Sequence, residues 1–101
     1  SAMQEDHVSM GWSAARKLRR SVDGLARVLA IELLSAARAL DLRRPLLPGP
    51  ATGAVLGALR ESVPGPGPDR YLAPEIEAAV EFVRSGRAVE VADGALAEPL
   101  R

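Results

Sequence analysis

The heptapeptide Val28-Leu29-Ala30-Ile31-Glu32-Leu33-Leu34 lies in the longest segment of the chain that contains no proline. Six of its seven side chains are apolar, and a helix that is apolar nearly all round is usually buried on every side. On both sides of this heptapeptide, apolar residues recur at steps of three and four, the period of an α-helix. They are Leu18, Val22, Leu25, Leu29, Leu33, Ala36, Ala37 and Leu40. We therefore predict one long helix over residues 9–42.

The predicted length of this helix has a consequence for the shape of the protein. At about 1.5 Å per residue it is roughly 50 Å long, whereas a compact chain of this size has a radius of gyration near 13 Å. Two short helices cannot cover such a helix on all faces, so we expect it to pack against other copies or other parts of a larger protein. The alternative is a break at Gly24 that folds the helix back on itself, since glycine in a helix interior costs about 1 kcal/mol relative to alanine.

Prolines divide the rest of the chain. Pro45, Pro48 and Pro50 end the first helix, because proline cannot donate to the helical hydrogen-bond ladder. A second helix is predicted over residues 51–62, with an apolar stripe of Val55, Leu56, Leu59 and Val63. The following stretch, residues 64–68, alternates proline and glycine and predicts a turn-rich linker.

A third helix is predicted to begin at Pro74, where proline suits the first turn and Glu75 and Glu77 complement the positive end of the helix. Ser85-Gly86 is a typical stop. Residues 87–101 are weakly patterned, and both a short strand and a frayed helix fit them, so we expect an irregular tail. The predicted fold class is all-α: one very long helix plus two shorter helices, part of an oligomeric helical bundle, with residues 1–86 as the helical region.

Composition excludes several classes of protein. Thirteen Lys and Arg balance thirteen Asp and Glu, which argues against a nucleic-acid or membrane-surface binder. One histidine and no cysteine leave too few ligands for the usual zinc sites and no disulfide framework, so no metal or bound cofactor is expected in this chain. Residues 1–11 lack the apolar core of a signal peptide and no run is long enough to span a bilayer, so a cytoplasmic setting is expected.

The polar cluster Gln4-Glu5-Asp6-His7-Val8-Ser9-Met10-Gly11 holds two carboxylates, one imidazole and one hydroxyl. Read from composition alone, it is a helix start, where Asp6 or Ser9 accepts a bond from a free backbone N–H. A Ser-His-Asp triad is not supported, because the members of a triad usually come from separate segments.

The same octet closely resembles a motif found late in the chain of histidine ammonia-lyases. Further segments look like successive landmarks of that family in the same order: Ala14-Ala15-Arg16-Lys17, Leu29 to Leu34, Pro50-Ala51-Thr52, and Asp69 to Ala79. The aromatic branches of the superfamily carry Asn-Gln-Asp-Val where this chain has Gln4-Glu5-Asp6-His7. Glu5 and His7 therefore favour the histidine branch, and the chain looks like a C-terminal fragment of such an enzyme.

The resemblance implies a specific chemistry. Members of this family eliminate ammonia from L-histidine to give urocanate, with a methylidene-imidazolone made from an internal Ala-Ser-Gly, and they are tetramers whose long helices form a central bundle. The position of Glu5 is then catalytic and substrate-binding, Gln4 is a substrate-binding neighbour, and His7 is a neighbour of the site. A carboxylate can pair with an imidazolium, which agrees with the branch difference.

The sequence also departs from the family. Its 101 residues contain no Ala-Ser-Gly, so we expect no lyase activity from this chain alone. Two other readings stay open: a stand-alone helical interaction or oligomerisation module, and a lyase or aminomutase of another aromatic amino acid.

Several residues outside the octet are candidates with a structural interpretation that we favour. The basic run of residues 16–20 is expected to be a solvated or salt-bridged face, and Glu32 to pair across a helix contact. Asp69-Arg70-Tyr71 is expected to form an ion pair that fixes the turn before the third helix. Trp12 is expected to pack, and Gly53 and Gly57 form a weak pattern for close helix contact.

Overall fold

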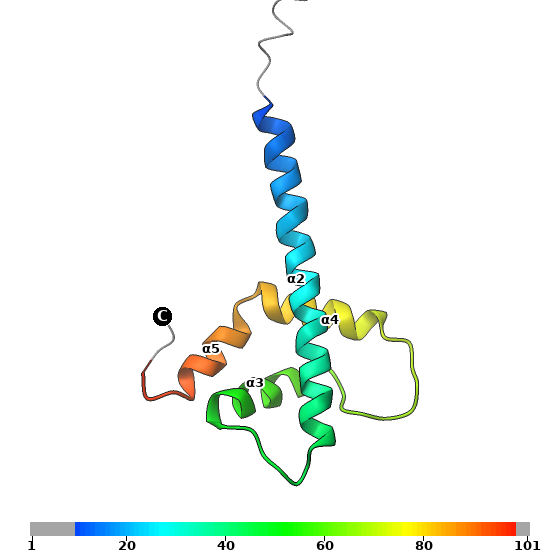
Figure 1. Ribbon diagram of the computed structural model, residues 1–101, viewed down its shortest axis with the longest axis vertical. Helices are drawn as coiled ribbons and strands as arrows, with labels where there is room; N and C mark the ends of the chain where they lie inside the picture. Colours follow the sequence, from blue (N-terminus) through cyan, green and yellow to red (C-terminus); the bar gives the residue numbers. More distant parts are fainter. Residues whose placement is uncertain (1–9, 99–101) are drawn as a thin grey trace, which may run out of the picture.

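The computed structural model describes residues 10–98, and in this range it is all-α, as predicted (Figure 1). The four helices are α2 (Gly11–Leu42), α3 (Pro50–Arg60), α4 (Ala73–Arg84) and α5 (Arg87–Gly94). α2 stands upright through the molecule, while α3, α4 and α5 gather around its C-terminal half (Figure 1).

α2 runs unbroken through Gly24, which excludes the folded-back alternative. Its 32 residues include no proline, and its content of Ala, Leu and Arg favours the helix throughout. The helix ends where the prolines begin. The N–H of Arg43 still donates to the carbonyl of Ala39 at 3.2 Å, but Pro45 has no N–H with which to continue the ladder.

α3 and α4 begin within a residue of their predicted positions, and both carry proline in the first turn. Proline is favoured there because the first N–H groups of a helix have no partner inside it. In α4, Glu75 lies in the first turn and Arg84 in the last, so both charges complement the helix dipole.

The irregular tail expected over residues 87–101 is wrong for its first part, because Arg87–Gly94 forms α5. Gly86 adopts φ +80°, in the left-handed region that favours glycine, and this turn redirects the chain between α4 and α5. Ala92 is buried, and Ala88 and Val91 pack against the core. Of the two alternatives for this stretch, a short strand and a frayed helix, the helix is the one present: Ala88, Val91 and Ala92 follow the helical period.

The core is made largely of small side chains. Its buried members are Ala30, Ala37, Ala58, Leu59, Val63, Ala79, Val80 and Phe82. Leu59 and Val63 are the largest fully buried side chains in the described range. α2 packs mainly against α4, which crosses it, and α3 packs mainly against α5 (Figure 1). Alanines on α2 and α4 let the two backbones approach closely.

Two exposed ion pairs join α2 to α4. Arg27 donates to Glu77 at 2.7 Å, and Arg84 donates to Asp23 at 2.9 Å. The hydrogen bond that Arg27 donates to the Glu77 carboxylate raises the pKa of Arg27, so this guanidinium stays charged at any physiological pH. Both pairs lie in solvent, where such contacts add little to stability; they link α4 to α2.

The N-terminal half of α2 protrudes beyond the other helices (Figure 1). The radius of gyration is 19.2 Å, well above the roughly 13 Å of a compact chain of this length. The first buried residue of α2 is Ala26. The structure thus agrees with the expectation that the helices of this chain do not cover all of α2.

Candidate functional site

The candidate catalytic and binding residues Gln4, Glu5 and His7 lie outside the described residues, as do the candidate capping residues Asp6 and Ser9. In the described part, Met10 occupies the N-cap position of α2, and it makes no side-chain capping bond. The chain enters α2 at the end remote from α3, α4 and α5 (Figure 1). The octet is therefore followed directly by an exposed helix.

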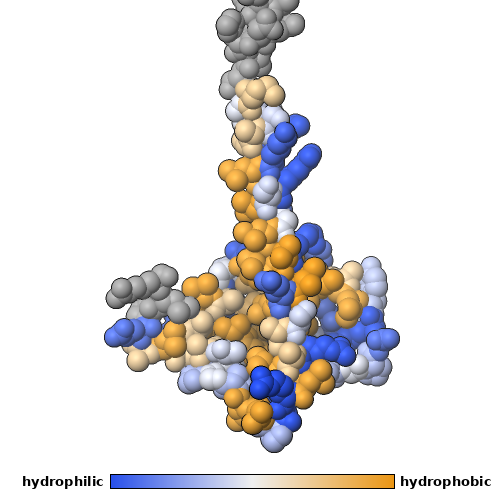
Figure 2. All heavy atoms as spheres, viewed as in Figure 1, coloured by the Kyte–Doolittle hydropathy of each residue, from blue (hydrophilic) through white to orange (hydrophobic). Residues whose placement is uncertain are grey.

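The protruding part of α2 is amphipathic, with one apolar and one polar side. Large apolar side chains lie exposed along it: Trp12, Leu18, Val22, Leu25, Val28 and Leu29. Figure 2 shows hydrophobic residues along one side of this segment and hydrophilic residues along the other. Monomeric proteins rarely expose a contiguous apolar stripe of this kind unless it is an interaction surface.

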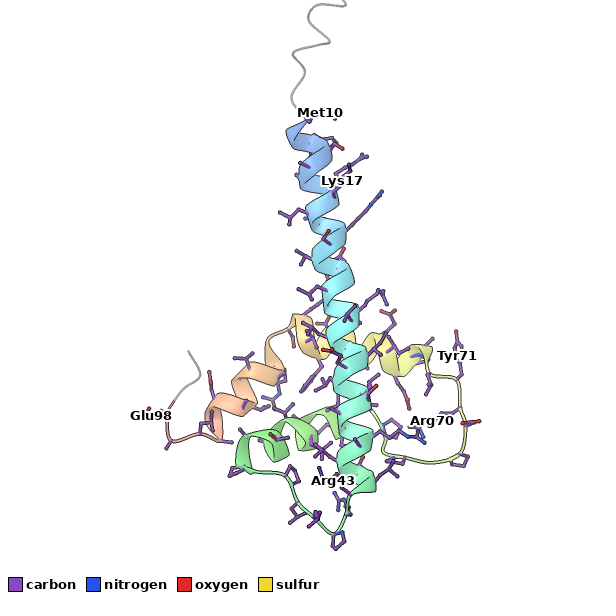
Figure 3. The ribbon with its side chains drawn as sticks, viewed as in Figure 1. Met10, Lys17, Arg43, Arg70, Tyr71 and Glu98 are labelled. Carbon is purple, nitrogen blue, oxygen red and sulfur yellow. The ribbon has the colours of Figure 1, made fainter. Side chains whose placement is uncertain are left out.

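The basic residues Arg16, Lys17, Arg19 and Arg20 are all exposed, and none has an ion pair among residues 10–98. Figure 3 shows Lys17 projecting away from the helix. Of the two alternatives for this run, a solvated face is therefore confirmed within the described range.

Two other expectations on α2 are not met among residues 10–98. Trp12 does not pack, because 74% of it is exposed. Glu32 is exposed and has no hydrogen bond or ion pair with any residue that the structure describes. The apolar ring of Trp12 is left without cover from residues 10–98, whereas the exposed carboxylate of Glu32 lies in solvent.

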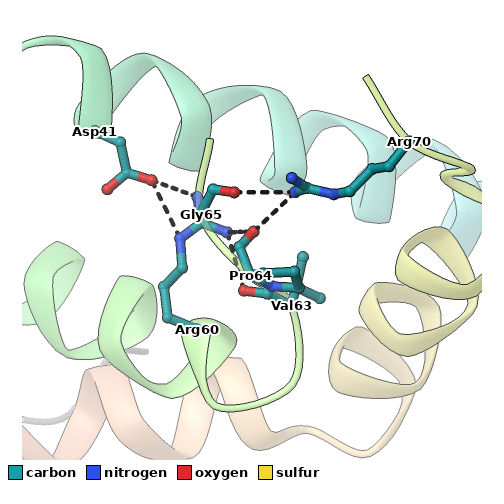
Figure 4. Close-up of polar contacts among 6 residues, drawn as sticks. All are labelled: Asp41, Arg60, Val63, Pro64, Gly65 and Arg70. Carbon is teal, nitrogen blue, oxygen red and sulfur yellow. Dashed lines mark hydrogen bonds and ion pairs between the residues drawn. The ribbon is translucent and has the colours of Figure 1, made fainter. Parts of the chain in front are cut away.

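A polar network fixes the proline-glycine linker at the opposite end of the molecule (Figure 4). Arg60 donates to Asp41 from Nη2 at 2.6 Å and from Nε at 3.1 Å, and it also donates to the carbonyls of Val63 and Pro64. Arg60 lies at the end of α3 and Asp41 near the end of α2. This one guanidinium therefore joins two helices and the start of the linker. Sequence reasoning missed this pair, since nothing marks two residues 19 positions apart as partners.

Arg70 completes the network. It donates to Glu75 at 2.6 Å and to the carbonyls of Pro64 and Gly65 at 3.2 and 3.0 Å. The prediction of an ion pair that fixes the turn before α4 is thus confirmed, with Arg70 and Glu75 as its members. Tyr71 takes no part: its side chain points away from the molecule (Figure 3), and 81% of the residue is exposed.

A groove of about 250 Å³ lies between α2, the linker and α4. Its lining is mainly apolar and includes Ile31, Leu34, Val63, Leu72 and Ile76. The only carboxylate in the lining belongs to Glu75, which Arg70 already pairs. The groove therefore offers no free acid or base for catalysis among its lining residues.

The remaining candidates do not form a site. Gly57 has no atom near the position of an added Cβ, and Gly53 meets only Pro48, so the close helix contact that this weak pattern could allow is not seen among residues 10–98. Among residues 10–98, no group of acidic or histidine side chains is able to hold a metal ion. No helix in that range is long and apolar enough to cross a membrane.

The comparisons with known proteins decide the family. The family model described as aromatic amino acid lyase matches residues 1–61, a range that includes the N-terminal octet, α2 and α3. The chain belongs to the aromatic amino acid lyase family. No solved structure matches the chain.

Relatives of this lyase chain include three proteins named histidine ammonia-lyase. The one from Streptomyces coelicolor is 61% identical over 102 aligned positions, with 100% of this chain and 20% of the relative covered. The one from Symbiobacterium thermophilum is 52% identical over 99% of this chain and 20% of its own length. The one from Shewanella oneidensis is 52% identical over 82% of this chain and 16% of its own length. The chain thus spans about a fifth of the length of these relatives.

Proposed function

We propose that this chain forms the C-terminal helical region of a histidine ammonia-lyase, an enzyme that eliminates ammonia from L-histidine to give urocanate. The observation that carries the proposal is the 61% identity to a histidine ammonia-lyase over the whole chain, octet included. We propose residues 1–86 as the region that corresponds to the family, and a cytoplasmic setting for the enzyme.

Glu5 is the proposed catalytic residue of this region. Its carboxylate can charge-pair with the imidazolium or the amino group of histidine, or accept a proton from the substrate. A charge-assisted hydrogen bond of this kind is roughly twice as strong as a neutral one. In the branches that act on phenylalanine or tyrosine, an amide at this position avoids leaving a charge unpaired beside an apolar ring. Gln4 contributes to substrate binding, and His7 lies next to both.

The methylidene-imidazolone of the family is made from Ala-Ser-Gly, and the 101 residues contain no such tripeptide. This chain therefore does not fit the group: it has no backbone from which to form it, and we assign it no step in that chemistry. Its proposed contribution is Glu5 and the helices that follow. The purified 101-residue chain should produce no urocanate, measured by the absorbance of the product, and any turnover would contradict the proposal.

The proposal is tested in the full-length lyase that contains this sequence. Glu5→Gln should lower kcat/KM for L-histidine by at least 100-fold, since loss of a group that meets charge on the substrate costs roughly 3 kcal/mol or more. The unfolding temperature should stay unchanged. Asp6→Asn, one residue further along, is the matched control and should retain most of the activity. Unchanged kinetics in Glu5→Gln would remove Glu5 from the site.

The surface of α2 supports a proposed homotetramer in which this helix contributes to a central bundle. Exposed apolar residues along α2 need cover from neighbouring chains, and the family resemblance implies that number of subunits. The same surface also favours the second candidate, a helical interaction module. The two differ in one observation: only the lyase loses histidine turnover when Glu5 is exchanged.

A further inference from the structure

The exposed stripe on the protruding part of α2 has the spacing of a coiled-coil seam. Ala15, Leu18, Val22, Leu25 and Leu29 follow one another at steps of three and four, the a and d positions of a heptad repeat. More than half of Leu18, Val22 and Leu25 is exposed, at 65%, 56% and 57%. Between residues 14 and 25 the large exposed apolar side chains keep to this stripe, which is typical of helices that pair with another helix. Further along, Val28 and Ile31 add exposed apolar surface beside it.

This seam lies on a different face of α2 from the one that packs on α4. The face toward α4 carries Asp23 and Arg27, which pair with Arg84 and Glu77, and the buried Ala26 and Ala30. Successive residues of a helix turn by about 100°. The seam is therefore centred about 110° away from the α4 face, and Leu18, Val22 and Leu25 stay exposed.

We propose that a second copy of α2 occupies this seam in the antiparallel direction, with Val22 of each copy opposite Leu25 of the other. This register also places Leu18 opposite Leu29 and Ala15 opposite Glu32. The inference rests on the proposed assembly of the lyase and goes beyond it by naming the direction, the register and the charged residues that specify them.

Charge decides the direction. Arg16, Lys17, Arg19 and Arg20 form a basic cluster at one end of the seam, and residues 11–22 contain no acid. A parallel pair in register would bring two such clusters side by side, and like charges at this distance repel. The antiparallel pair separates the clusters and also opposes the two helix dipoles.

Glu32 supplies the complementary charge. It occupies the d position that ends the seam, is exposed, and has no partner among residues 10–98. In the antiparallel register, Arg19 of the second copy lies beside the seam about one turn from Glu32. Helical side chains lean toward the N-terminus of their own helix, so these two lean toward each other. Each dimer then holds two such pairs.

The absence of cysteine from the chain makes a direct test simple. Leu18→Cys and Leu29→Cys should each fail to form a disulfide-linked dimer alone, because two equivalent sites lie about 16 Å apart along the antiparallel pair. An equimolar mixture of the two variants should form the linked dimer under mild oxidation, since a disulfide needs Cα atoms closer than about 7 Å. A dimer formed by Leu18→Cys alone would overturn the antiparallel direction.

Charge-reversal variants at Arg19 and Glu32 test the register of the helix pair without introducing cysteine. Arg19→Glu and Glu32→Arg should each weaken self-association of the 101-residue chain by about tenfold, as two pairs per dimer turn repulsive. The double variant Arg19→Glu/Glu32→Arg should restore the affinity of the original chain. Arg20→Glu is the matched control: it makes the same change in net charge on the side of α2 opposite the seam, and it should leave association unchanged.

Two further outcomes would overturn the proposal. One is failure of the double variant to recover affinity while each single variant keeps its helix content by circular dichroism. The other is a chain that stays monomeric at high concentration but binds vesicles of anionic phospholipid, which would make the stripe a membrane-surface helix. Neither outcome affects the result of the Glu5→Gln activity test. Failure of this proposal is therefore distinguishable from failure of the proposed function.

Discussion

Arg60 on α3 and Asp41 on α2 are joined twice, through Nη2 at 2.6 Å and Nε at 3.1 Å, and both donors reach the same carboxylate oxygen. The side chains are only 21% and 13% exposed. A partly buried pair with this geometry is worth more than an ion pair in solvent. The pair also orders the linker, because Arg60 donates to the carbonyls of Val63 and Pro64.

Removal of this guanidinium should be costly. Arg60→Ala leaves the Asp41 carboxylate and two carbonyls without their donor, and we expect the free energy of unfolding to fall by about 2–3 kcal/mol. Arg87→Ala is the matched control, because Arg87 pairs with Glu90 at 3.5 Å on an exposed surface; it should change stability by less than about 0.5 kcal/mol. Urea denaturation of both variants measures the difference, and equal effects would contradict a special role for Arg60.

Among the core residues, truncation of Leu59 should cause the largest loss of stability. It is fully buried between α3 and its neighbours, so Leu59→Ala should lower the free energy of unfolding by about 2–5 kcal/mol through lost burial and the cavity left behind. Leu47→Ala removes the same atoms from a residue that is 79% exposed and should have almost no effect. Thermal unfolding followed by circular dichroism compares the two, and similar unfolding temperatures would show that the core is elsewhere.

Substitution of alanine for two of the glycines should change the free energy of unfolding in opposite directions. Gly86 has φ +80°, which alanine adopts at a cost of roughly 1–2 kcal/mol, so Gly86→Ala should destabilise the turn before α5. Gly24 lies inside α2 with no atom near an added Cβ, so Gly24→Ala should raise stability by about 0.5–1 kcal/mol. Equilibrium unfolding of both variants gives the signs. Destabilisation by Gly24→Ala would mean that α2 is not a continuous helix at that point.

Local sequence signals accounted for most of the fold. The long helix followed from the three-and-four spacing between Leu18 and Leu40, and Pro45, Pro50 and Pro74 marked where helices end or begin. For α5 the sequence left a short strand and a frayed helix open, because Val89 and Val91 alternate like a strand. The decisive feature is the left-handed turn at Gly86, which returns the chain to the core and lets Ala92 bury its side chain.

Contacts between distant residues were harder to foresee. The pairs Asp41–Arg60 and Arg27–Glu77 join positions 19 and 50 residues apart, and sequence periodicity carries no information about such distances. Trp12 and Glu32 were expected to find partners, and within residues 10–98 they do not. In both cases the residue type suggested a contact, but residue type alone does not show whether a neighbouring helix of this chain reaches that face of α2. The roles of Gln4, Glu5 and His7 remain predictions from the sequence.

The physical inference behind the whole interpretation is that α2 carries more apolar surface than α3, α4 and α5 can cover, so the chain works within an assembly. Sedimentation equilibrium of the 101-residue chain measures this most directly. We expect a concentration-dependent mass of at least two copies, and a return to the monomer mass in the variant Val22→Ser/Leu25→Ser with its helix content retained. A folded monomer at every concentration, with Trp12 fluorescence showing the stripe shielded from water, would contradict it.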